Sequence, residues 1–569
     1  MAMKLDDNLF PAESSQNILV TGCLGIILLF PWVFVFALPP LQMGIWFNTE
    51  GVAWGIASLG AFASLILLCV CIDDIKKSHT GYLYVHLSRT NPLLLGTVGL
   101  AATSVIMLPF SFDKHLSWFG HPEQMTGGWL WLSISAIMLC YLWLRQSPHY
   151  PKYKQAIRIS VEFACYAQIA LVLFAHPQFT NASGNWVLYH FTSHLGWIGA
   201  CLLILSIGNF GKLSFVTRFF AIVAILLSQN KIALGALIGG PILYMITSKY
   251  RPPEKRGITL LIVLLGAPLS LIIAEYMAFS WVILPTLSSR FISLKVLWAD
   301  YIHAPLLNLF TGMGWGQMSD SILRQLPSLK SSSLQEATWE GIGRFDASSL
   351  NQTADALAAV GIIGAVGSFL ISLSLFLLSR KYFNQQENCF KQKVDKSFLF
   401  TACLITMLLH HGWFMMLSIL PIFISTVITS DIPDIIKLKK DVQRNGIKNK
   451  DVQATKFLRC IAAGLSGVVL LWTSHSIYST AVFYSGDLKS LPVRLAWKFK
   501  ADYLLNCENL VANRGPGSIP LAFWLRSYQS STNPFKQDQT ISQEIKCALK
   551  TIRQCSSHPP LTLLSLVQD

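Results

Sequence analysis

The feature that most constrains this chain is a succession of apolar segments, each close to the length needed to cross a lipid bilayer. A spanning helix needs about 20 mostly apolar residues. Charged residues make up only 13% of the chain and hydrophobic residues 53%, which excludes a soluble enzyme because so much apolar surface could not be buried. We therefore predict an all-α polytopic membrane protein with about twelve or thirteen transmembrane helices. The predicted spans are residues 18–38, 52–72, 92–110, 128–144, 159–175, 195–207, 213–227, 232–248, 258–284, 357–378, 397–409, 414–429 and 461–481.

The positions of Lys and Arg predict how the chain is oriented. Cytoplasmic loops carry an excess of these residues, and here every second short loop is basic, beginning with the loop that holds Lys76, Lys77 and Arg89. The intervening segments 39–51 and 176–194 contain neither residue type. We expect a cytoplasmic N-terminus and, with thirteen spans, an external C-terminal tail. The net charge of +15 then reflects cytoplasmic loops, and we expect no nucleic-acid partner.

Two long polar segments divide the chain into four parts. Residues 285–356 form a large external loop, and residues 484–569 form an external tail that we expect to be partly helical. An N-terminal bundle of about nine spans (1–284) precedes the loop, and the remaining spans (357–483) follow it. The sequence contains no apparent internal repeat, which disfavours an inverted-repeat transporter.

Three of the twelve cysteines lie in the predicted external tail: Cys507, Cys547 and Cys555. An odd number outside the membrane predicts one disulfide and one unpaired cysteine, and the sequence leaves the pairing open. The other cysteines lie in predicted spans or cytoplasmic loops, where Cys packs as a small apolar side chain. No spacing of Cys, His and acidic residues predicts a metal site, so we expect no metal and no other cofactor.

The external loop contains an alternating glycine motif, Gly312-Met-Gly314-Trp-Gly316. Glycines in such a pattern let the backbone turn tightly and approach a ligand closely. A tight turn that leads the chain back to the membrane is the structural alternative. No Gly-Lys-Ser/Thr follows, which excludes a phosphate loop of the nucleotide-binding type.

Two further polar segments flank predicted spans. The loop ends at Asn351 and Gln352, and we expect a helix to begin there at the outer mouth of a span. These side chains either cap that helix or meet a lipid head group. A hairpin tip at Ser228–Lys231 carries a single charge, that of Lys231, which either binds phosphate or marks the membrane interface. Gly235 and Gly239 follow with the spacing of closely packed helices.

Taken together, these segments resemble the O-antigen ligase and polymerase superfamily, which includes the bacterial O-linked protein oligosaccharyltransferases. The resemblance covers roughly residues 165–425. A shorter stretch at 39–50 resembles the first periplasmic loop of the protein-glycosylating branch, and residues 181–185 resemble the Asn-rich segment that precedes the sixth span in the family. The matching positions are Ser228–Lys231, Arg290, Trp298, Gly312, Gly314, Gly316, Asn351, Gly361 and Gly364.

The resemblance implies a glycosyltransferase of the bacterial inner membrane with a periplasmic loop and tail. Such enzymes move a glycan from a polyprenyl-diphosphate carrier, such as undecaprenyl diphosphate, to an acceptor hydroxyl on the periplasmic face. The expected partners are therefore this lipid-linked glycan, an acceptor protein or glycolipid, and membrane lipids. Three acceptors are consistent with the resemblance: lipid A-core, a growing glycan, or a protein side chain. Among these acceptors, the external tail favours a protein side chain.

This chemistry requires cations for the diphosphate and a base for the acceptor. Arg binds phosphate oxygens with a planar fork, which favours Arg290, followed by Lys231 and Arg344. The candidate bases are His303, Asp346, Asp300 and Glu340, and the unperturbed pKa of His, about 6.5, favours His303. We predict that the catalytic group comprises Arg290, His303, Asp346 and Asn351, and that the substrate-binding group comprises Lys231, Gly312, Gly314, Gly316, Arg344 and Gln352.

The chain departs from the family pattern at three positions. Leu350 stands where the family has His, Ala359 where it has Glu, and Lys231 where Arg is more usual. His410 and His411 reach the outer face at a short predicted turn. A lipid-linked glycan transporter and a catalytically inactive membrane assembly protein therefore stay open as alternatives to the enzyme.

Overall fold

A computed structural model gives the arrangement of the chain, and almost all of the residues that it describes are helical. These are residues 13–36, 46–77, 92–111, 117–118, 127–146, 150–179, 186–207, 212–228, 230–250, 306–315, 352–383, 390–412 and 419–429, with short pieces between 252 and 266 and between 463 and 474. The elements are α1 (Glu13–Phe36), α2 (Trp46–Lys77), α4 (Pro92–Met107), the 3-10 turn η2 (Leu108–Phe110), α6 (Gly128–Gln146), α7 (Tyr150–Phe179), α8 (Trp186–Leu205), α9 (Lys212–Leu227), α10 (Lys231–Tyr250), α13 (Leu306–Thr311), α16 (Gln352–Phe383), α17 (Phe390–Gly412) and α18 (Ile419–Thr429).

The protein is an all-α membrane protein. Five of the described helical segments are long and apolar enough to cross a membrane: Gly55–Ile72, Pro92–Phe110, Gly128–Arg145, Lys231–Tyr250 and Gln352–Ser374. Shorter apolar segments lie in α1, α8 and α9. Several helices extend beyond the apolar runs: α7 begins nine residues before its predicted span at 159, and α2 begins at Trp46, within the predicted loop 39–51.

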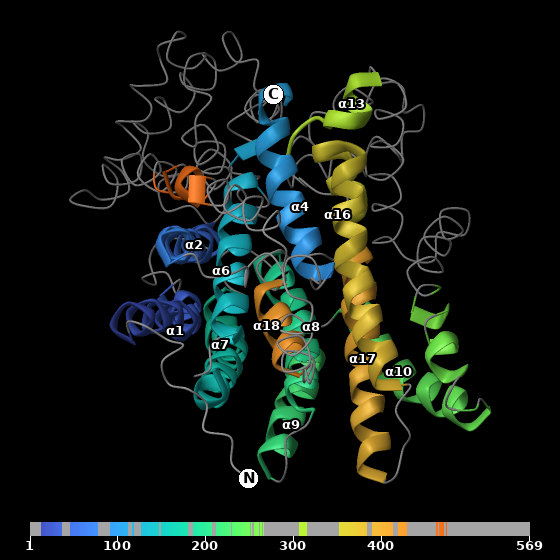
Figure 1. Cartoon of the computed structure of the whole chain (residues 1–569). Helices are drawn as coiled ribbons and strands as arrows, with labels where there is room; N and C mark the ends of the chain where they lie inside the picture. Colours follow the sequence, from blue (N-terminus) through green and yellow to red (C-terminus); the bar gives the residue numbers. More distant parts are fainter. Residues whose placement is uncertain are drawn as a thin grey trace, which may run out of the picture.

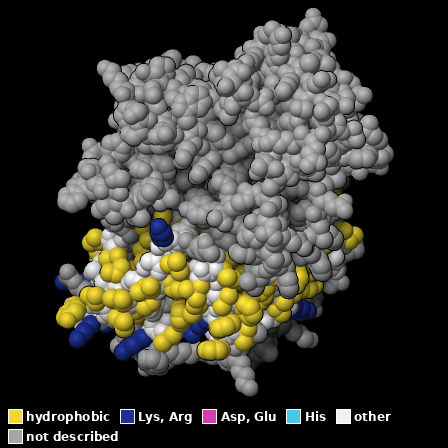
Figure 2. Space-filling view, turned by 180° about the vertical axis from the view of Figure 1, so that it is seen from behind, with side chains coloured by type: hydrophobic (Ala, Val, Ile, Leu, Met, Phe, Trp, Pro, Cys, Tyr) yellow, Lys and Arg dark blue, Asp and Glu magenta, His cyan; other side chains and the backbone are white. Residues whose placement is uncertain are grey.

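The outer surface of the helices is apolar, as a bilayer requires. Large side chains such as Phe215, Ile238, Met245 and Leu226 are exposed on α9 and α10. Figure 2 shows hydrophobic side chains forming a broad band over the described part of one face, with most of the Lys and Arg side chains near the lower edge of the band. This pattern follows from helices whose apolar faces contact lipid and whose ends carry the charges.

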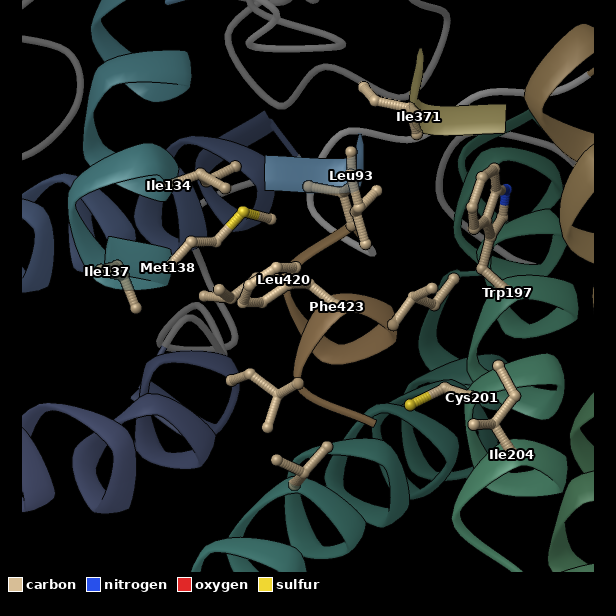
Figure 3. Packing of buried hydrophobic residues seen from close by; sticks show 14 of the residues in the cluster. Leu93, Ile134, Ile137, Met138, Trp197, Cys201, Ile204, Ile371, Leu420 and Phe423 are labelled. Carbon is tan, nitrogen blue, oxygen red and sulfur yellow. The ribbon is translucent and has the colours of Figure 1, made fainter. Parts of the chain in front are cut away.

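The core lies where α6, α7 and α8 surround the short helix α18. Leu420 and Phe423 of α18 are completely or almost completely buried, and in Figure 3 they point toward Met138 of α6. Figure 1 shows α18 between α6, α7 and α8. A strongly apolar helix is covered either by lipid or by other helices, and the burial of Leu420 and Phe423 shows that other helices cover these side chains of α18.

Small residues allow pairs of helices to approach closely. A Cβ atom at Gly60 of α2 would overlap Ser133 of α6, and one at Gly240 of α10 would overlap Thr401 of α17. Close approach of this kind is the usual basis of helix packing in membranes. The prediction that Gly235 and Gly239 form such a contact was wrong for the described residues, because none of the other described segments comes within 4 Å of a Cβ built at either position. The contact is made at Gly240, on the face of α10 that meets α17.

Helix α16 turns back on itself at Gly361, which the sequence analysis did not predict. The backbone leaves the helical region at Val360 (φ −132°, ψ 20°) and Gly361 (φ 71°, ψ −164°). The Thr353 and Ser368 hydroxyl oxygens lie 3.0 Å apart, although 15 residues of straight helix would span about 22 Å. Residues 352–359 therefore run antiparallel to residues 362–383. The predicted span 357–378 overlaps Gln352–Ser374, which is long and apolar enough to cross a membrane, but the chain reverses within it at Gly361.

Candidate functional site

The glycine motif of the external loop docks on the turn of α16. Met313 donates its backbone N–H to the Ala358 carbonyl oxygen (2.7 Å), and Gly314 donates its own to Ala359 (2.9 Å). These carbonyls belong to the last turn of segment 352–359, where a helix leaves acceptors without internal partners. The loop therefore caps the C-terminal end of this short helix. Figure 1 shows α13, which leads into the motif, beside the upper end of α16.

Three glycines make this docking sterically feasible. Gly312 (φ 72°), Gly314 (φ 108°) and Gly361 (φ 71°) all have positive φ, which other residues rarely adopt. A Cβ at Gly312 would overlap Ala359, and one at Gly361 would overlap the Phe310 carbonyl. Both glycines are thus in contact with protein backbone. The alternative of a tight turn therefore describes Gly312 and Gly314 well.

Trp315 anchors the motif to the bundle. Its indole Nε1 donates a hydrogen bond to the Ser104 hydroxyl of α4 (2.8 Å), and the side chain is buried. Its ring lies 5.9 Å from the ring of Trp131 of α6, measured between centroids. A buried Trp needs a partner for its N–H, and Ser104 supplies it. The loop motif is therefore held by α4, α6 and α16 together.

We expect Trp315→Phe to lower the free energy of unfolding by about 1–2 kcal/mol, because the ring is retained and the buried hydrogen bond is lost. Thermal unfolding of the purified protein in detergent measures this change. Ser104→Ala, which removes the acceptor, should cost a similar amount, and the double variant should cost less than the sum of the two. Strictly additive effects would show that the two side chains do not interact.

A line of buried polar side chains lies beneath the turn of α16. Ser368 contacts the Thr353 hydroxyl at 3.0 Å and the His410 Nε2 atom of α17 at 2.9 Å. Ser368 and His410 are completely buried. Gln352, next to Thr353, is 1% exposed, and its amide nitrogen Nε2 has no hydrogen-bond partner. A helix begins at Gln352, as expected, and its side chain is buried inside the protein.

The predicted hairpin tip joins α9 and α10. Asn230 caps α10, because its Oδ1 accepts hydrogen bonds from the backbone N–H groups of Ile232 (2.9 Å) and Ala233 (3.3 Å). Ser228 accepts one from the Asn230 N–H (3.2 Å). The cap supplies a partner within the protein for two of the free N–H groups at the start of α10. Lys231 is exposed at the first position of the helix.

We expect Asn230→Ala to destabilise the protein by about 1 kcal/mol through loss of this cap. Asn230→Ser retains an oxygen acceptor and should recover most of the loss. The midpoint of thermal unfolding in one detergent and at one protein concentration is the measurement. Equal midpoints for the alanine variant and the wild type would contradict the capping role.

The tip lies near the end of α17 that carries His410. A Cβ at Gly196 of α8 would lie 3.1 Å from Leu409 Cδ1, 3.2 Å from Ala233 Cβ and 3.8 Å from Ser228 Oγ. Leu409 immediately precedes His410. The start of α10 and the end of α17 therefore pack against the same part of α8.

Four of the predicted site residues lie in the described part of the chain: Lys231, Gly312, Gly314 and Gln352. The others, together with the three tail cysteines, lie outside it: Arg290, His303, Gly316, Arg344, Asp346 and Asn351. Sequence analysis missed Thr353 and Ser368, and it placed His410 at a turn. The only sequence signal for a contact between Thr353 and Ser368 is that they lie on either side of Gly361. That signal becomes informative only once the reversal of α16 is known.

Among the described residues, no three His, Cys, Asp or Glu side chains gather as metal ligands would. No protein-family model and no curated protein matches this chain, so comparison with known proteins assigns no family to it.

Proposed function

We propose that the protein is a glycosyltransferase of the bacterial inner membrane that moves a glycan from a polyprenyl-diphosphate carrier to an acceptor hydroxyl on the periplasmic face. The observation that carries the proposal is the docking of segment 312–315 on the turn at Gly361. Both segments belong to the pattern by which the chain resembles the O-antigen ligase and polymerase superfamily. The contact between segment 312–315 and the turn at Gly361 supports the idea that these two segments, far apart in the sequence, form one structural unit.

The proposed reaction has two electrostatic requirements. Negative charge develops on the leaving diphosphate and is stabilised by fixed cations, for which Arg290, Lys231 and Arg344 are the candidates. The attacking hydroxyl must lose its proton to a base within hydrogen-bond reach. The proposed orientation, with a cytoplasmic N-terminus and a periplasmic loop and tail, puts these cations on the side where the lipid-linked glycan is consumed.

A transporter of lipid-linked glycans is the second candidate. The interruption of α16 favours it, because transporters bind substrates at discontinuous helices within the membrane. The enzyme and the transporter differ in their products: the enzyme forms a new glycosidic bond and releases polyprenyl diphosphate, whereas the transporter leaves its substrate intact.

Purified protein in lipid nanodiscs tests the proposal. It is mixed with a polyprenyl-diphosphate glycan labelled in the sugar and with one of three acceptors: a Ser-containing peptide, lipid A-core or a short glycan. The enzyme should move the label to an acceptor and release polyprenyl diphosphate. Recovery of the intact donor with every acceptor would contradict the proposed activity.

We favour a protein acceptor, because the external tail resembles the layout of the protein-glycosylating branch. Deletion of the gene should then remove glycan from an envelope protein and leave lipopolysaccharide unchanged. Short-chain lipopolysaccharide with normal glycoproteins would instead identify a ligase or polymerase of polysaccharides.

A further inference from the structure

We propose that one end of the helix bundle binds the head groups of anionic phospholipids through a surface of exposed lysines. This surface, the basic rim, consists of Lys152 at the start of α7, Lys393 at the start of α17 and Lys255 shortly after α10. All three residues are exposed. The inference does not depend on the proposed transfer reaction, because it assigns a binding surface for one class of lipid outside the candidate site.

Hydrogen bonds between helices bring the start of α7 to the same end of the bundle as the junction between α8 and α9. Arg158 of α7 donates from its guanidinium to the Leu205 carbonyl oxygen in the last turn of α8. Ser214, near the start of α9, donates its hydroxyl to the Ser206 carbonyl oxygen just after α8 (3.0 Å). Lys152 precedes Arg158 in the same helix and lies about 9 Å nearer its start, so it belongs to this end.

The start of α17 and the end of α10 lie at this end as well. Arg218 of α9 forms an ion pair with Asp395 of α17, which puts the first two turns of these helices side by side. The end of α17 and the start of α10 pack against the same part of α8, so α10 and α17 run antiparallel and α10 ends where α17 begins. Lys393 and Lys255 therefore lie at the same end of the bundle as Lys152.

The acidic residues of these helices are already paired. The only carboxylates in α7, α8, α9, α10 and α17 are those of Glu162 and Asp395. Glu162 accepts a hydrogen bond from Arg158 Nε (3.0 Å), and Asp395 accepts one from Arg218. The rim lysines therefore have no carboxylate partner on these five helices, and this end of the bundle carries an excess of positive charge.

Exposed apolar side chains adjoin two of the rim lysines. Ile159, two turns after Lys152 on the same helix face, is 52% exposed. Ile258 and Ile262, one and two turns after Lys255, are 53% and 64% exposed. A lysine beside such residues packs its methylene stem on apolar groups and holds its ammonium group at the level of the lipid head groups. In Figure 2 most of the described Lys and Arg side chains accordingly lie near one edge of the hydrophobic band.

A phospholipid fits this combination because one molecule carries both a phosphate and apolar chains. Positive charge alone would suit any anion, but the neighbouring isoleucines favour an anion that is joined to acyl chains. The head group must also have a net negative charge, as in phosphatidylglycerol, because the choline of phosphatidylcholine neutralises the phosphate. Each Lys near an anionic membrane surface strengthens binding about fivefold.

Lipid binding to the purified full-length protein in a neutral detergent tests the assignment. The protein is titrated with phosphatidylglycerol and, in parallel, with phosphatidylcholine of the same acyl chains, and native mass spectrometry counts the bound lipids. The wild type should bind phosphatidylglycerol at least about fivefold more tightly than phosphatidylcholine. The triple variant Lys152→Gln, Lys255→Gln and Lys393→Gln should lower the affinity for phosphatidylglycerol about fivefold or more and leave that for phosphatidylcholine unchanged.

The matched control is the triple variant in which the same three lysines are replaced by Arg. It keeps every positive charge and should bind phosphatidylglycerol within about twofold of wild type. Ammonium phosphate at the concentration of the lipid should not displace the bound phosphatidylglycerol, because it has no acyl chains. Thermal unfolding in the same detergent establishes that each variant is folded.

Four outcomes would overturn the proposal. Equal affinity of the wild type for the two lipids would show that the rim does not select charge, and an unchanged affinity in the Gln variant would show that anionic lipid binds elsewhere. An equal loss in the Arg and Gln variants would identify an effect of side-chain shape. Displacement of the lipid by ammonium phosphate would identify a general anion site. Glycan transfer is not measured in this experiment, so failure of the proposed function would leave the basic rim in place.

Discussion

Gly361→Ala should yield little folded protein, with a loss of about 3 kcal/mol or more in the free energy of unfolding. The reason is twofold. With φ 71° and ψ −164°, Gly361 occupies a backbone region that is essentially restricted to glycine. The new Cβ would also overlap the Phe310 carbonyl oxygen and lie 3.0 Å from that of Leu309. The measurement is the yield of monodisperse protein and its thermal unfolding in detergent.

Gly235→Ala is the matched control for this substitution. Gly235 lies in α10, and in the part of the chain that the structure describes no other segment comes within 4 Å of a Cβ built on it. Alanine favours a helix over glycine by about 1 kcal/mol, so this variant should be as stable as the wild type or slightly more stable. Equal stability of the Gly361 and Gly235 variants would contradict the reversal of α16.

Arg290→Ala should abolish glycan transfer while the protein stays folded. In the proposed reaction the diphosphate gains charge as it leaves, and a guanidinium can bind two of its oxygens at once. Removal of one such stabilising group typically lowers kcat by about 100- to 1000-fold. The transfer assay in nanodiscs measures this loss, and thermal unfolding establishes that the fold is retained.

Two further substitutions separate a specific contact from a general effect of charge. Arg290→Lys keeps the positive charge but loses the planar fork, so its rate should lie between those of wild type and Arg290→Ala. Lys249→Ala removes an exposed cation at the other end of α10 from Lys231 and should leave transfer unchanged. Wild-type turnover by Arg290→Ala would remove Arg290 from the site.

The sequence by itself determined the class of the protein and the positions of several of its apolar helices. Apolar runs predict spans because the bilayer acts on each segment separately, so that length and hydropathy suffice. The hairpin tip at Ser228–Lys231 is found as predicted between α9 and α10. The sequence also identified Gly312 and Gly314, since alternating glycines indicate positions where the backbone turns tightly.

Only the tertiary structure decided how these segments meet. The run 357–378 is continuously apolar, so hydropathy cannot distinguish a straight helix from one that reverses at Gly361. The cost of this reversal is offset by contacts with residues 309–314, which lie far away in the sequence. For the same reason the sequence could not show that the Gln352 side chain is buried. Ser368 and His410 form a pair only because α16 packs on α17, and such pairing depends on the whole bundle rather than on any local pattern.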